Sequence, residues 1–133
     1  MAQNYKTRRA QLDCLYDNIG SLDDPCVYCG SPSMVYDHVP PLHYVDRAKD
    51  EPESLRKYPA CSECNSALSG LILLTLKERR KRIREYLRKK YKSFLSMPRW
   101  SEDELAELEP QFADEIRRAS RFAEIVKLRV SFY

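Results

Sequence analysis

The sequence predicts an α+β fold in which a small zinc-stapled core is followed by a long basic helix and C-terminal helices. Two Cys-x-x-Cys pairs, Cys26/Cys29 and Cys61/Cys64, enclose 31 residues, and a short β-type run lies between them. After the second pair the apolar residues follow helical spacing. A chain of 133 residues supports one modest core, so we expect a single domain with three parts: an N-terminal helical segment (1–24), the stapled core (25–70) and a helical extension (71–133).

The composition is that of a globular protein that stays inside the cell. Hydrophobic residues make up 43% of the chain and charged residues 32%, with a net charge of +3. No run approaches the roughly 18 apolar residues of a membrane span, and no apolar segment follows the N-terminal charges as it would in a secretory signal. We therefore expect a cytoplasmic protein, and the compact size suits a phage or mobile-element protein that acts in its host cell.

The paired cysteines predict a structural zinc ion. Disulfides are disfavoured in a reducing compartment, and each Cys-x-x-Cys turn brings two thiolates to one metal. The alternative, four buried cysteines acting as small apolar residues, is disfavoured by the repeated spacing. Gly30 directly follows Cys29, where a tight metal-binding turn favours a positive φ. Cys14 stands alone and is expected to be a buried cysteine rather than a fifth ligand.

Between the two pairs the sequence predicts one strand and one irregular loop. Ser33–Val39 is a short β-type run, and Pro40 ends it. Leu42–Tyr58 is polar, and Pro52 and Pro59 exclude long regular elements there. We expect the cysteine clamps to hold this loop in place.

The second cysteine pair is followed by the sequence of a long helix. A start between Ser62 and Asn65 is expected, and from Ala67 to about Phe94 only Gly70 interrupts the helical pattern. At about 1.5 Å per residue this helix would extend on the order of 40 Å. Its buried face would consist of apolar residues at helical spacing: Leu68, Ile72, Leu76, Ile83, Leu87, Tyr91 and Phe94.

The other face of this helix is strongly cationic. Between Lys77 and Lys92 ten basic residues stand against Glu78 and Glu85. Such a face is either a solvated surface or a polyanion-binding one, and the charge density favours nucleic acid, whose phosphates release counterions when neutralised. The residues predicted to contact DNA are Arg79, Arg80, Arg82, Arg84, Lys89 and Lys90.

The C-terminal third predicts helices without chemistry. Ser101 with Glu104 forms the pattern of a capping box, and Pro110 separates this start from a second helix. The second helix carries an apolar stripe that would pack on the basic helix or on the same segment of a second copy in a homodimer: Phe112, Ile116, Ala119, Ala123, Val126 and Val130.

The residues suited to chemistry lie between and beside the cysteine pairs. His38 and His43 are the only histidines, and Asp37 precedes His38 at the end of the β-type run. Asn65 directly follows Cys64. The succession Cys-x-x-Cys, Asp-His-Val-Pro, Cys-x-x-Cys-Asn resembles the HNH endonucleases of the His-Me finger (ββα-metal) group, and the resemblance covers residues 26–70.

This resemblance implies a metal-dependent DNA endonuclease built on a ββα-metal core. His38 would be the general base that activates water, and Asp37 and Asn65 would bind one catalytic Mg2+ or Mn2+. The chemistry suits these residue types, because a neutral imidazole accepts a proton near neutral pH and a carboxylate with an amide oxygen suits a hard cation. The four-cysteine zinc would then be structural.

Two departures from the family pattern leave two outcomes open, a weak or nicking activity and an inactive descendant of the family. Ser54-Leu55 stands where the family often has Asn-Leu, and Ser66–Gly70 lacks the basic residue often found after the Cys-x-x-Cys-Asn element. Ser54 has a shorter side chain than asparagine with which to brace the active-site loop.

Other roles for the three site residues are also open at this point. Asp37 would hydrogen-bond a loop, Asn65 would adopt a left-handed conformation after the zinc turn, and His38 would replace one cysteine as a zinc ligand. In the last case His43 would be the substitute base. The corresponding alternative function is a catalytically inactive zinc-knuckle protein that binds nucleic acid or regulates a partner.

Overall fold

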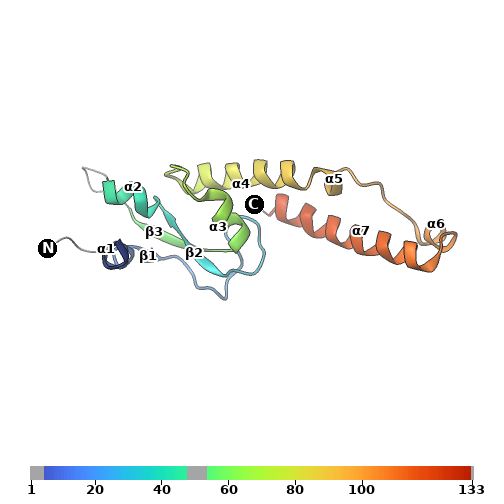
Figure 1. Cartoon of the computed structure of the whole chain (residues 1–133), viewed down its shortest axis with the longest axis horizontal. Helices are drawn as coiled ribbons and strands as arrows, with labels where there is room; N and C mark the ends of the chain where they lie inside the picture. Colours follow the sequence, from blue (N-terminus) through green and yellow to red (C-terminus); the bar gives the residue numbers. More distant parts are fainter. Residues whose placement is uncertain (1–4, 48–53, 133) are drawn as a thin grey trace.

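The computed structural model describes residues 5–47 and 54–132, which form an α+β fold with a three-stranded mixed sheet and seven helices. The sheet and the first helices form one end of an elongated molecule, and a helical hairpin extends from it (Figure 1). The elements in chain order are α1 (Tyr5–Asp13), β1 (Asp17–Asn18), β2 (Val35–Val39), α2 (Leu42–Arg47), β3 (Arg56–Ala60), α3 (Ser62–Leu68), α4 (Leu76–Lys90), α5 (Lys92–Leu95), α6 (Glu102–Ala106) and α7 (Pro110–Val130).

The sheet has the order β1-β3-β2, with β2 antiparallel and β1 parallel to the central strand β3. The strand predicted over Ser33–Val39 is confirmed as β2. The irregular loop predicted over Leu42–Tyr58 is wrong, because α2 and β3 occupy part of it, while Pro52 lies outside the described residues. Pro59 is tolerated in β3 because β1 pairs only with Arg56 and Lys57, so no neighbour requires the missing N–H on that side.

The single long helix predicted after the second cysteine pair is also wrong, since α3 ends at Leu68 and α4 begins at Leu76. Gly70 lies between them with φ +78°, a left-handed conformation that a helix cannot continue through. Thr75 then caps α4 by accepting a hydrogen bond from the backbone N–H of Glu78 at 3.2 Å. Ile72 belongs to the connection and is 61% exposed instead of buried.

The helical hairpin, formed by α4 and α5 on one side and α7 on the other, buries much of the predicted apolar stripe. Helix α7 returns along α5 and α4, so its stripe packs within the chain (Figure 1). Ile116, Ala123 and Val126 are buried as expected, whereas Phe112 is exposed and Ala113 takes its place in the interface. The predicted capping box at Ser101 is present at the start of α6.

The main core surrounds the cysteine pairs. Leu68, Ile83 and Leu87 pack on them from α3 and α4. Cys14 is exposed, which corrects the prediction that it is buried. Within the described part of the chain, no helix is long and apolar enough to cross a membrane.

Candidate metal centre and catalytic pocket

Four buried cysteines form a site that fits a tetrahedral zinc ion. The Sγ atoms of Cys26, Cys29, Cys61 and Cys64 lie within 4.8 Å of one another, and those of Cys29 and Cys61 are 3.7 Å apart. Tetrahedral zinc with Zn–S bonds of about 2.3 Å separates its sulfurs by roughly 3.8 Å. Each of the four residues is at most 7% exposed, so the site is closed to substrate. The donor set and spacing are those of a structural zinc centre.

Local backbone structure delivers the two cysteine pairs. In the first turn the N–H of Gly30 donates to the carbonyl of Cys26 at 2.9 Å, and Gly30 has the positive φ (+76°) expected from the sequence. In the second, Cys61 is the N-cap of α3, and its Sγ accepts from the backbone N–H of Cys64 at 3.4 Å. Backbone N–H groups at a helix start favour the thiolate that zinc requires.

The four thiols perturb one another strongly. The hydrogen bond between Cys26 and Cys29 raises the pKa of Cys26 and lowers that of Cys29. Hydrogen bonding with Cys26 likewise lowers the pKa of Cys61 and raises that of Cys64. A bound divalent metal would replace this mutual hydrogen bonding, since the ligands of zinc are thiolates.

Helix α7 reaches the metal centre through Arg129. Its guanidinium forms a 2.8 Å ion pair with Glu63, which lies on α3 between Cys61 and Cys64. Burial alone would lower the pKa of Arg129, but hydrogen bonds with Cys29 and Glu63 raise it overall. Four thiolates around Zn2+ carry a net negative charge, so this buried cation offsets it.

A second site lies beside the zinc centre, where a pocket of about 230 Å³ collects the residues singled out in the sequence. Asp37 and His38 reach it from β2 and Asn65 from α3. The remaining lining comes from α1, α2, the end of α3, α4 and the connections: Arg9, Pro41, Leu42, His43, Leu68, Ser69, Gly70 and Arg79. The structure therefore brings the three predicted catalytic residues to one pocket with cationic neighbours.

Asp37 is held in a buried ion pair with Arg79 of α4. Arg79 donates from Nη2 to Oδ1 at 2.7 Å and from Nε to Oδ2 at 2.8 Å, and Tyr28 donates its hydroxyl to Oδ2. The two charged side chains are only 3% and 5% exposed. Burial would lower the pKa of Arg79, but its bond to Asp37 raises it. Asp37 therefore forms a buried ion pair with a helix and does not only hydrogen-bond a loop.

The carboxylate of Asp37 retains one position for a metal ion. Oδ2 accepts two hydrogen bonds and is saturated, whereas Oδ1 accepts one and has a second lone pair. Together with the amide oxygen of Asn65, this lone pair provides the two protein ligands that Mg2+ often uses beside water and phosphate. These two residues are the ones that could hold such an ion, and the guanidinium of Arg79, 2.7 Å from Oδ1, adds a positive charge close by.

His38 follows Asp37 on β2, and its side chain meets α1. Its Nε2 is 2.5 Å from Oδ1 of Asp13, and Lys57 donates to both oxygens of Asp13 at 3.2 Å. The ring of Tyr16 packs edge-on against the imidazole, with the two ring centroids 4.7 Å apart. His38 is therefore not a zinc ligand. Asp13 and Lys57 were missed because no local motif links α1 or β3 to His38 on β2.

The last two predicted residues show no unusual backbone. Asn65 is half-buried within α3, and the described non-glycine residues include none with positive φ, so the left-handed alternative for Asn65 is wrong. His43 is exposed near the start of α2 and lines the pocket.

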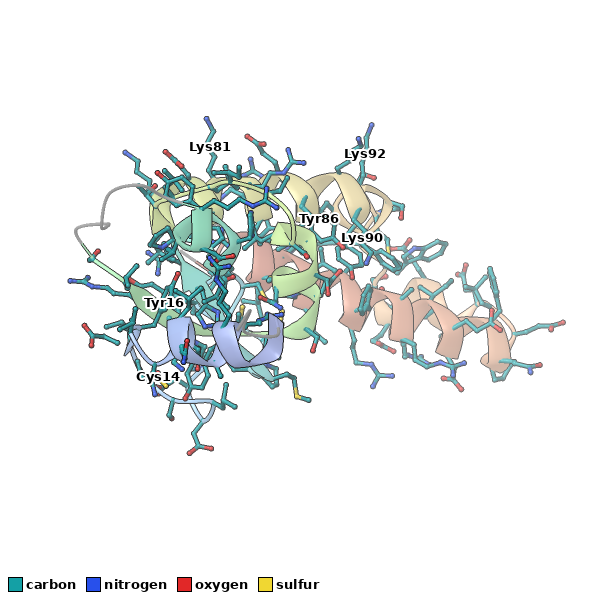
Figure 2. All side chains as sticks on the ribbon, turned by 60° about the vertical axis from the view of Figure 1, so that its left-hand side comes forward. Cys14, Tyr16, Lys81, Tyr86, Lys90 and Lys92 are labelled. Atoms are coloured by element: carbon teal, nitrogen blue, oxygen red, sulfur yellow. The ribbon has the colours of Figure 1, made fainter. Side chains whose placement is uncertain are left out.

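The six basic residues predicted to bind DNA divide into two groups. Arg79 is buried against Asp37, Arg80 donates to the carbonyl of Val27, and Lys90 pairs with Glu63 at 2.8 Å. Arg84 is half-buried. Arg82 and Lys89 are exposed, as are further cations on the same surface: Lys77, Lys81, Arg88 and Lys92. Figure 2 shows Lys81 and Lys92 pointing outward along one edge of the molecule.

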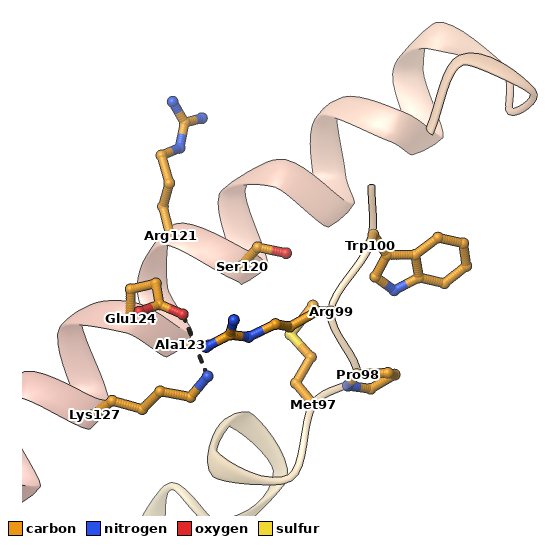
Figure 3. A pocket seen from close by; sticks show the side chains of 9 residues that line it. All are labelled: Met97, Pro98, Arg99, Trp100, Ser120, Arg121, Ala123, Glu124 and Lys127. Atoms are coloured by element: carbon orange, nitrogen blue, oxygen red, sulfur yellow. Dashed lines mark hydrogen bonds and ion pairs between the residues drawn. The ribbon is translucent and has the colours of Figure 1, made fainter. Parts of the chain in front are cut away.

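A larger pocket of about 430 Å³ lies in the helical hairpin, away from these residues. It lies between the connection that carries Arg99 and Trp100 and helix α7 (Figure 3). On α7, Glu124 forms an ion pair with Lys127 at 3.3 Å. The lining of this pocket contains no histidine or cysteine.

No family model, curated protein or solved structure matches this chain. A functional assignment therefore depends on the geometry of the two sites.

Proposed function

We propose that the protein is an endonuclease that hydrolyses phosphodiester bonds in DNA at the pocket formed by Asp37, His38 and Asn65. The observation that carries the proposal is the convergence of these three side chains, an imidazole, a carboxylate and an amide, on one pocket with arginines in its lining. A structural zinc centre beside the pocket holds α3 against the sheet. Each residue type has a defined task in phosphodiester hydrolysis.

His38 is the general base of the proposed reaction. It takes a proton from a water molecule, and the resulting hydroxide attacks the scissile phosphorus while the P–O bond to the leaving 3′ oxygen breaks. The leaving oxygen takes up a proton from solvent water. The imidazole is only 18% exposed, and packing against Tyr16 limits its rotation. A base held in this way needs little reorganisation before proton transfer.

Asp37 and Asn65 are the residues that would hold Mg2+ or Mn2+. A bound divalent cation supplies Lewis-acid chemistry and stabilises charge on the phosphate. Arg79 and Tyr28 hold the Asp37 carboxylate so that the remaining lone pair of Oδ1 is available. Arg79 and Tyr28 thus resemble the hydrogen-bond partners that orient metal ligands in other sites.

DNA would lie along α4. This helix begins beside the pocket, which Arg79 lines, and its exposed cations continue along its length. Phosphate contacts of this kind are independent of base sequence and weaken as salt rises. The exposed members Lys81, Arg82 and Lys89 are the cations we assign to this contact.

The test is cleavage of supercoiled plasmid by zinc-loaded protein with and without Mg2+ or Mn2+. Asn65→Ala and His38→Ala are expected to abolish nicking, whereas Ser66→Ala, an exposed neighbour on α3, keeps it. Asp37→Ala is less informative because it also breaks the buried ion pair. Cleavage that survives both His38→Ala and Asn65→Ala would refute the assignment.

The second candidate is a zinc-stapled nucleic-acid-binding protein without catalysis. The observation in its favour is the occupation of three of the four Asp37 acceptor positions by Arg79 and Tyr28. Salt-sensitive gel shifts without cleavage under any divalent metal would select this candidate. Loss of the shift in a Lys81→Ala/Arg82→Ala/Lys89→Ala variant would identify α4 as the binding surface.

A further inference from the structure

We propose that Asp13 is a positioning residue that fixes His38 in the tautomer with its proton on Nε2, leaving Nδ1 as the proton acceptor. This inference rests on the proposed function for its catalytic meaning, but the tautomer is a property of the protein alone. Asp13 ends α1, outside the cysteine-stapled segment. The N-terminal helix would thereby complete the catalytic site.

The hydrogen bond itself determines the tautomer. The pKa of Asp13 is lowered, chiefly by its hydrogen bond with His38, so the carboxylate is ionised near neutral pH. An ionised carboxylate only accepts hydrogen bonds. The 2.5 Å contact between Asp13 Oδ1 and His38 Nε2 therefore requires the proton on Nε2. In a neutral imidazole the other nitrogen, Nδ1, is then the unprotonated one.

The sheet register supports the same arrangement. His38 on β2 lies directly opposite Lys57 on β3, so both side chains lie on one face of the sheet. Lys57 donates to both oxygens of Asp13 at 3.2 Å, which holds a carboxylate that is 40% exposed. Tyr16 packs on the imidazole from α1's side, and its hydroxyl donates to the carbonyl of Pro40. Asp13 and Tyr16 thus contact the imidazole directly, and Lys57 holds Asp13 in place.

Replacement of Asp13 by asparagine gives a sharp outcome. The amide has nearly the same shape, but its NH2 group can donate to Nε2 where the carboxylate can only accept. We expect the proton to move to Nδ1, which removes the base of the proposed reaction. Asp13→Glu retains an acceptor and is expected to retain the native tautomer.

Nitrogen and carbon chemical shifts of isotope-labelled histidine report the tautomer, and the chain has only two histidines. His43→Gln assigns the two signals, and Asp17→Asn, in the neighbouring strand β1, is the matched control. Wild type, Asp17→Asn and Asp13→Glu are expected to show the Nε2–H form, and Asp13→Asn the Nδ1–H form. An Nδ1–H form of His38 in the wild-type protein would overturn the proposal.

Plasmid cleavage separates this inference from the proposed function. With Asp13→Asn the turnover number is expected to fall by about 10²- to 10⁴-fold, the usual contribution of a general base, with little change in KM. Full activity in Asp13→Asn would overturn the positioning role. A tautomer change in a protein that never cleaves DNA would instead refute the nuclease proposal and retain the control of His38 by Asp13.

Discussion

Replacement of Arg79 by methionine tests whether the buried ion pair is a main support of the fold. Methionine has a similar length and no charge, so the packing changes less than the electrostatics. The variant leaves Asp37 5% exposed with Tyr28 as its remaining hydrogen-bond partner. Removal of one partner of a buried pair typically costs about 3–5 kcal/mol. We expect the lower end of this range, because the Tyr28 hydroxyl still stabilises the carboxylate.

The expected effect is large enough for thermal unfolding to resolve. An unfolding entropy of about 2.1 cal mol⁻¹ K⁻¹ per residue, applied to 133 residues, converts a loss of about 3 kcal/mol into a Tm decrease of roughly 10 °C. Circular dichroism in zinc-saturated buffer measures this decrease. Arg82→Met, an exposed position on the same helix, is the control and should change stability by less than about 0.5 kcal/mol.

A double variant separates charge from packing. In Arg79→Met/Asp37→Leu no buried charge remains, so this protein is expected to be more stable than Arg79→Met alone. A Tm for Arg79→Met within 3 °C of wild type would refute the reasoning, as would a double variant that is less stable than the single one. The first result would show that the unpaired carboxylate costs little, and the second that the cost comes from packing.

Three further changes test the surroundings of the zinc centre. Burial would raise the pKa of Glu63, but hydrogen bonds, the largest from Lys90, lower it from 4.5 to about 2. In denaturant titrations, the stability advantage of wild type over Glu63→Gln should therefore be complete above pH 4.5 and shrink as the pH falls toward 2. Arg129→Gln should weaken zinc binding by about 10- to 100-fold in chelator competition, and an unchanged affinity would contradict the contact with Cys29. Gly30→Ala should lower the Tm more than Gly70→Ala does, because both glycines have positive φ but only the new Cβ at Gly30 would lie 2.6 Å from the ring of Phe132. Equal decreases in Tm would exclude that clash.

Local signals in the sequence were sufficient for the zinc centre and for part of the fold. The spacing of the cysteine pairs predicted four converging thiolates, and Gly30 adopted its expected conformation. The break between α3 and α4 was missed, although Gly70 and the capping pattern Thr75-Leu-Lys-Glu78 both marked it. The apolar periodicity of the connecting residues concealed that signal.

Other features depended on contacts between distant segments. Nothing near Arg79 in the sequence distinguishes it from the cations around it, and only the packing of α4 against the core places it on Asp37. In the same way, Asp13 is an ordinary acidic residue at the end of a helix until α1 meets β2. Strand β3 was missed because its pairing with β1 and β2 decides its conformation more than its composition does.

The two adjacent residues Asp37 and His38 show why a motif confined to the core is insufficient for the proposed chemistry. Both residues line one pocket, but their side chains contact different elements. Arg79, from the helical extension, fixes the first, and Asp13, from the N-terminal helix, fixes the second. The cysteine-stapled segment therefore supplies the reactive groups, while the segments on either side of it determine their orientation. Under the proposed function, the helical extension would therefore orient a reactive group as well as contact DNA.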